Sequence, residues 1–170
     1  MVSLRDLLRL ASRTFAIGIE QLPGVLCDAG TVAYLLLRVS DYLEDNEDMS
    51  AEEKIELLNL WAAILKGEAH CESLTSRIQT TDTSNPDAVV AQHAKDILER
   101  LSSLPEEARE IITHHVIHST QGMARWVERG PNMDDEKDLD DYMFEVAGRV
   151  GYLLTHLFAW YSLSIRTQIK

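Results

Sequence analysis

Apolar residues recur at helical spacing along most of the chain, and few stretches alternate with the two-residue period of a β-strand. The pattern predicts about six helices, over residues 3–21, 25–46, 50–66, 86–101, 105–129 and 142–165. Proline and glycine separate several of them, and residues 79–87 form a polar loop between the third and the fourth. We therefore expect an all-α helical bundle in which residues 1–170 form one domain.

The second predicted helix is apolar on several faces, which is typical of a buried helix, yet it carries one narrow polar line. At about 100° per residue, Tyr34, Arg38, Asp41 and Asp45 fall within roughly 60° of one another. A buried carboxylate costs several kcal/mol unless it is paired or bound to a metal. The line therefore indicates a cavity in which a divalent cation offsets the two aspartates.

The alternative is a solvated acidic end of the helix. For Glu44, Glu47 and Asp48 we favour that interpretation, whereas for Asp41 and Asp45 the sequence alone leaves both interpretations open. Two carboxylates one helical turn apart can share one or two Mg²⁺ ions whose remaining ligands are phosphate oxygens.

The formal net charge of −12 argues against nucleic acid as a partner, because phosphate binding needs clustered lysine and arginine. An acidic protein can still hold an anion through a bridging metal ion or a few aimed arginines. Cys27 and Cys71 form no metal-binding pair, and the first residues contain no signal-peptide core. We expect a cytoplasmic protein, with peripheral contact to a membrane if its ligand is a lipid.

Two separated motifs resemble the squalene/phytoene synthase family. The first comprises Ser-Arg-Thr-Phe at residues 12–15, Leu-Pro at 22–23 and the helix AYLLLRVSDYLED at 33–45. The second, DDYMFEVAGRVG at residues 140–151, is similar to the family's Tyr-Cys-x-x-Val-Ala-Gly-x-Val-Gly element, with Met143 in place of the cysteine. The resemblance spans nearly the whole chain and about the first half of a typical family member.

The resemblance implies an isoprenoid-synthase-type helical bundle and a transferase of prenyl groups. Such enzymes join two prenyl diphosphates, farnesyl or geranylgeranyl, head to head to form squalene, phytoene or a related product. The implied cofactor is Mg²⁺, with Mn²⁺ as its substitute, and the sequence leaves open whether NADPH is used. The metal acts as a Lewis acid that draws off the diphosphate and leaves an allylic cation.

The resemblance also assigns roles to particular residues. It gives catalytic roles to Tyr142, Asp41 and Asp45, of which the two aspartates bind the metal. The residues implied in substrate binding are Ser12, Phe15, Tyr34, Arg38, Val146, Val150, Gly151 and Leu154. Tyr142, Val146, Val150 and Leu154 recur every four residues, which predicts that they share one face of a helix.

The family's second aspartate-rich motif does not occur in the 170 residues. We therefore expect a truncated bundle, and we do not expect full activity from this chain alone. The alternative function is a non-catalytic fragment of a truncated or split synthase that associates with itself or with a second half through an exposed apolar face. His114, His115 and His118 lack the spacing of a di-iron or zinc motif, and we expect no metal there.

Overall fold

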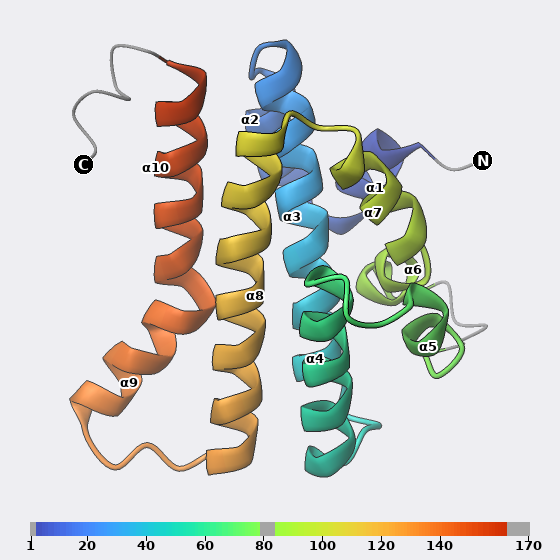
Figure 1. The fold of residues 1–170 in the computed structure, drawn as a ribbon. Coiled ribbons are helices and arrows are strands. Elements are labelled where there is room, and N and C mark those ends of the chain that lie inside the picture. The colour runs from blue at the N-terminus through green and yellow to red at the C-terminus, as the bar shows by residue number, and fades with distance from the viewer. Residues whose placement is uncertain (1–2, 79–83, 163–170) are drawn as a thin grey trace.

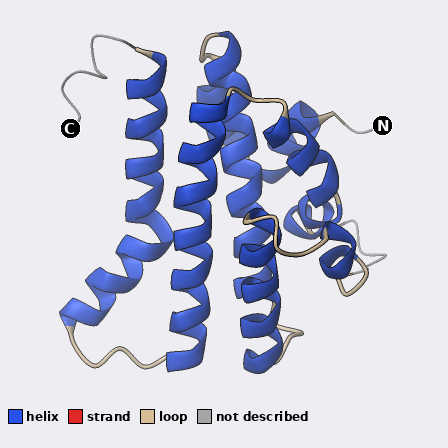
Figure 2. Ribbon diagram, in the orientation of Figure 1, coloured by secondary structure: helices blue, strands red, loops and turns tan. Residues whose placement is uncertain are grey.

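The computed structural model describes residues 3–78 and 84–162, which form helices joined by loops, with no strand among them (Figures 1 and 2). The helices are α1 (Leu4–Ala11), α2 (Arg13–Glu20), α3 (Gly24–Asp45), α4 (Ala51–Leu65), α5 (Cys71–Thr75), α6 (Pro86–Gln92), α7 (Ala94–Ser102), α8 (Glu106–Arg129), α9 (Glu136–Met143), the π-helical turn η1 (Phe144–Gly148) and α10 (Arg149–Tyr161). The expectation of an all-α chain is thus confirmed for the described residues.

The long helix α3 lies at the centre of the bundle (Figure 1). On one side it contacts α1, α6 and α7, and on the other it contacts α4 and α8. Helix α10 packs along α8 and also reaches α3, so the segment from α9 to α10 forms an outer layer next to α8. This arrangement places the polar line of α3 beside the helices that carry the second motif.

Burial of α3 explains why its sequence is apolar almost all round. Leu35, Leu36 and Leu43 are fully buried, and they share one core with Leu57 and Trp61 of α4. Each such side chain contributes roughly 1.5–3 kcal/mol to stability when it leaves water. A helix with this much apolar contact can tolerate a few charged groups, provided that each finds a partner.

Three of the predicted helices are interrupted. Ser12 has extended backbone and its hydroxyl accepts a hydrogen bond from the Phe15 amide at 3.2 Å, so the first predicted helix divides into α1 and α2. His93 divides the fourth into α6 and α7, and its Nδ1 lies 2.9 Å from the Val89 carbonyl oxygen. In the sixth, η1 stands between α9 and α10, and the predicted end at residue 165 lies outside the described residues.

The remaining boundaries agree closely with the sequence pattern, except that the sixth predicted helix begins at Glu136 and not at residue 142. Helix α4 begins after Ser50, whose hydroxyl accepts from the Glu53 amide at 3.2 Å, one half of the predicted capping box. The five-residue α5 was not predicted, because one and a half turns show no periodicity. Within the part of the chain that the structure describes, no helix is long and apolar enough to cross a lipid bilayer.

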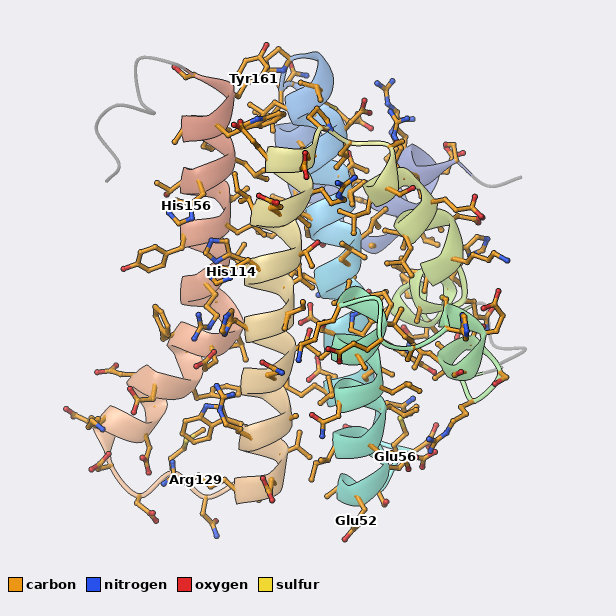
Figure 3. All side chains as sticks on the ribbon, in the orientation of Figure 1. Glu52, Glu56, His114, Arg129, His156 and Tyr161 are labelled. Carbon is orange, nitrogen blue, oxygen red and sulfur yellow. The ribbon has the colours of Figure 1, made fainter. Side chains whose placement is uncertain are left out.

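A pair of histidines joins α8 to α10, and Figure 3 labels its member on α10, His156. His115 is buried, and its Nε2 lies 2.8 Å from Nδ1 of His156. Burial, followed by the charges of His156, His114 and Arg149, lowers the pKa of His115 to about 4. Nδ1 of His115 has no hydrogen-bond partner in the structure, so the neutral ring suits this position and the imidazolium does not.

We predict that this pair makes stability depend on pH. The pKa of His115 falls from 6.5 in the unfolded chain to about 4 in the folded one. The stability linked to neutral His115 is therefore fully present above about pH 6.5 and is lost as the pH falls towards about 4. The free energy of unfolding, measured with urea, should fall less between about pH 7.5 and about pH 5 in His115→Gln than in the wild type. The exposed His70, changed to Gln, is the control, and equal pH dependence in all three proteins would contradict the prediction.

Candidate functional site

Arg38 and Asp41, in the middle of the polar line of α3, form ion pairs and are not fully solvated. Nη1 of Arg38 donates to Oδ2 of Asp41 at 2.8 Å, and its Nε donates to Oδ1 of Asp87 on α6 at 2.9 Å. Nη2 of the same guanidinium donates to the other carboxylate oxygen of Asp87. All three side chains are about one quarter exposed. One cation thus stands between two carboxylates, and the group keeps an excess of negative charge.

The surroundings of Asp41 favour its protonated form. Burial above all, together with the charges of Asp45 and Asp87, raises the pKa of Asp41 to about 6, against the lowering effect of Arg38. A carboxyl group in this state gains from a divalent cation, because the metal replaces the lost water and offsets the neighbouring charges.

Asp41 and Arg38 stand at one end of the lining of an apolar cavity of about 340 Å³. Helices α2 and α3 supply one wall, and η1 and α10 supply the other. The lining residues are Phe15, Ile19, Gly30, Ala33, Tyr34, Leu37, Arg38, Asp41, Val146, Ala147, Val150, Leu153 and Leu154. Seven of the residues predicted to bind substrate or metal meet in this one cavity, namely Phe15, Tyr34, Arg38, Asp41, Val146, Val150 and Leu154.

The break at Ser12 is what brings α2 to this cavity. It lets α2 turn back against α3, where the rings of Phe15 and Tyr34 lie 5.6 Å apart, centroid to centroid. Phe15 is still 60% exposed, so its ring covers the cavity without being packed in the core. Ser12 itself does not line the cavity, and its hydroxyl serves as the cap of α2.

A second cavity, of about 470 Å³, lies beside the end of α3. It is lined by Glu44, Asp45, Met49, Ala51, Lys54, Trp126, Val127, Gly130, Pro131, Met133 and Tyr142. The rings of Tyr142 and Trp126 meet edge to face at 5.6 Å. Asp45 is exposed on this side, so the two predicted metal ligands line neighbouring cavities.

The expectation of a solvated helix end is wrong for Glu44. Glu47 and Asp48 are exposed, as expected, but Glu44 is partly buried and makes a side-chain hydrogen bond with Tyr142. Burial, followed by the charges of Asp45 and Asp41, raises the pKa of Glu44 to about 7. Burial and the charges of Glu44 and Asp45 also raise the pKa of Tyr142. The D-x-x-E-D string therefore contributes its glutamate to the site as well.

The predicted common face of Tyr142, Val146, Val150 and Leu154 is only partly correct. The last three line the apolar cavity, whereas Tyr142 lines the second one. The cause is η1, because a π turn places one more residue in the helix than an α turn and so shifts the face that follows.

Gly151 lies away from both cavities. It is exposed, and a Cβ built on it would meet no atom within 4 Å. At Gly148 an added Cβ would lie 2.8 Å from the Phe144 ring, so this glycine makes room within its own segment. The position of Gly151 therefore gives no support to its predicted contact with substrate.

Sequence reasoning missed Asp87. It lies 49 residues from Arg38, and only a three-dimensional contact joins the two. The one available signal was Asn85-Pro86-Asp87, which reads equally well as the ordinary start of a helix.

A sequence model of the family described as squalene/phytoene synthase matches residues 8–165. This chain belongs to the squalene/phytoene synthase family. The match includes both motifs and every residue of the two cavities.

Individual family members show the same relationship. Squalene synthase BSS of Botryococcus braunii is 34% identical over 90% of this chain, and squalene synthase of Mus musculus is 30% identical over 89%. The matches cover 32% and 34% of those two proteins, so the chain spans about a third of the length of the curated relatives it matches.

Solved structures support the fold. TcSQS in complex with the ligand BPH1237 superposes with a TM-score of 0.78 at 24% identity, over 93% of this chain and 44% of that one. TcSQS in complex with E5700 gives the same TM-score over 91% and 43%. The described helices thus have the all-α isoprenoid-synthase fold.

We predict that Asp41 lowers the stability of the metal-free protein. Its pKa is 3.8 in the unfolded chain and about 6 in the folded one. The folded state therefore favours the protonated form, and the associated stability is present below about pH 3.8 and lost as the pH rises through about 6. At about pH 7.5 without metal, Asp41→Asn should raise the free energy of unfolding by roughly 1 kcal/mol. Asp48→Asn at an exposed position is the control, and a loss of stability in Asp41→Asn alone would refute the argument.

Proposed function

We propose that this domain binds a prenyl diphosphate, with the prenyl chain in the apolar cavity and the diphosphate held through Mg²⁺ at Asp41 and Asp45. The observation that carries the proposal is the cavity itself. Its lining is apolar along α2, α3, η1 and α10, and it reaches a charged group at Arg38 and Asp41. Its volume of about 340 Å³ lies within the range of small-ligand sites.

The donor groups suit Mg²⁺ rather than a softer metal. Asp41 and Asp45 offer hard carboxylate oxygens, and Mg²⁺ is commonly held by one or two carboxylates together with substrate phosphates. No group of three His, Cys, Asp or Glu side chains that could hold a metal occurs among residues 3–78 and 84–162. When bound, Mg²⁺ would neutralise the departing diphosphate, and Mn²⁺ could take its place.

The other residues would act on the substrate directly. Arg38 would donate its remaining N–H groups to phosphate oxygens. Tyr142, whose side chain meets Glu44, would stand near the reacting carbon at the second cavity. Val146, Val150 and Leu154 would line the prenyl chain and keep water away from an allylic cation.

The complete reaction that we propose is head-to-head condensation of two farnesyl or geranylgeranyl diphosphates to squalene, phytoene or a related product. The support for it is family membership, together with two neighbouring cavities that share the end of α3. A protein with lipid substrates is also expected to work in the cytoplasm or at a membrane surface.

Thermal unfolding with and without ligand tests the binding site. Mg²⁺ with inorganic diphosphate, at about 100 times its dissociation constant, should raise the melting temperature by about 5–10 °C. Asp41→Ala/Asp45→Ala should abolish the shift. The matched control is Glu47→Ala/Asp48→Ala, which removes the same charge from the exposed side of this chain segment. An equal shift in both double variants would overturn the proposed site.

A second candidate function is supported by the outer surface of η1 and α10. Phe144, Tyr152, Phe158 and Tyr161 are 38–56% exposed, and the Phe144 and Tyr152 rings lie 5.9 Å apart. Exposed aromatic groups of this kind often mark an interface. In this alternative the domain is a non-catalytic module that associates through this surface with a polypeptide that carries the rest of the family's length.

We expect the isolated chain to self-associate through the same surface when that partner is absent. Sedimentation velocity should then show a dimer or larger species, and Tyr152→Glu/Phe158→Glu should shift the distribution to monomer because it places charge on the aromatic surface. Ile17→Glu, at a 67% exposed position on α2, is the control. A wild type that stays monomeric over the whole concentration range would contradict the association function.

A further inference from the structure

The first turn of α6 presents a carboxylate to the diphosphate site. Asp87 is the second residue of α6, and Asn85 caps this helix by accepting hydrogen bonds from the amides of Asp87 at 3.0 Å and Ala88 at 3.4 Å. Pro86 fixes the backbone at the first helical position. The place of Asp87 is therefore determined by the start of its own helix before its side chain meets α3.

The contact between Asp87 and Arg38 is a bidentate ion pair. Both carboxylate oxygens of Asp87 accept from the guanidinium, one from Nε at 2.9 Å and the other from Nη2. Nη1 donates to Asp41 at 2.8 Å. Three of the five N–H groups of the guanidinium are thus engaged, and two are left for a ligand. A bidentate ion pair fixes the plane of the guanidinium, which a single hydrogen bond does not do.

We propose that Asp87 is a positioning residue of the diphosphate site, which orients Arg38 so that its two remaining N–H groups are available to phosphate while Asp41 stays open to metal. The inference rests on the proposed function, since it assigns Arg38 to the diphosphate. It adds a residue from α6, a helix that carries neither of the two motifs.

The charges of the site explain why such a residue is needed. Without Asp87, Arg38 is free to close on Asp41 with two N–H groups and to compete with Mg²⁺ for both carboxylate oxygens. With Asp87 in place, Arg38 gives Asp41 a single hydrogen bond, and one carboxylate oxygen of Asp41 remains for the metal. Residues that orient metal-site groups in this way typically change affinity by 10–100-fold when they are removed.

A control variant can separate the positioning role of Asp87 from a purely structural one, in which its ion pair only holds α6 against α3. Ala88, Val90 and Ala91 of α6 are buried in the core, so apolar contacts already hold α6 against α3. A comparable bridge joins α3 to α7, where Arg100 donates to Asp28 at 2.7 Å. Asp28→Ala therefore removes an ion pair between α3 and the same layer of helices without touching Arg38.

Isothermal titration with Mg²⁺ and inorganic diphosphate tests the proposal. Asp87→Ala should weaken diphosphate binding by about tenfold, and Asp87→Glu should restore part of the loss. Asp28→Ala should bind as the wild type does. In an Arg38→Ala background, Asp87→Ala should cause no further loss, because Asp87 acts through Arg38. Wild-type affinity in Asp87→Ala, or an equal loss in the Arg38→Ala background, overturns the positioning role.

A nitrogen-15 NMR spectrum of the Arg38 Nε–H group, assigned by its loss in Arg38→Ala, separates this inference from the proposed function. Slow exchange of that proton with water in the wild type, lost in Asp87→Ala and kept in Asp28→Ala, supports the fixed guanidinium without any ligand. If this pattern is seen but the wild type binds no diphosphate, the proposed function fails and the orientation of Arg38 by Asp87 stands. If the proton exchanges at the same rate in the wild type and Asp87→Ala, the inference fails.

Discussion

The structure depends on how a largely buried helix carries charge. Helix α3 supplies the centre of the core, yet its partly buried side presents Arg38 and Asp41 to an apolar cavity. Charges in such surroundings are stable only when each is paired, and here the pairing is made by Asp87 from another helix. The pairing is incomplete by one negative charge, and in the proposed function that charge is what a bound Mg²⁺ would offset.

Much of the fold could be predicted from the sequence, because α3, α4 and α8 are long and lie between proline, glycine and helix-capping residues that the sequence shows directly. The breaks at Ser12 and His93 could not, since each depends on a local side-chain contact with the backbone that competes with a continuous apolar pattern. The short helix α5 was missed for lack of length. These breaks matter, because the one at Ser12 folds α2 over the apolar cavity.

The spacing along α3 predicted which of its polar side chains meet, except for Asp45. Tyr34, Arg38 and Asp41 line the same cavity, whereas Asp45 lines the second one. Contacts between distant segments, those of Asp87 with Arg38 and of Glu44 with Tyr142, could not be predicted from the sequence. Neither contact produces a periodic pattern in the sequence. In the sequence alone Glu44 cannot be told from an ordinary exposed acidic residue.

The π turn η1 has a consequence for how such a protein can change. Because the turn sets the angle between α9 and α10, the helix surface that holds Tyr142 and the one that holds Val150 and Leu154 are independent of each other. If the proposed function holds, substitutions along α10 would lengthen or shorten the space for a hydrocarbon tail while Tyr142 keeps its neighbours. Selection for a new tail length and selection for the bond-forming chemistry would then proceed separately within one continuous stretch of chain.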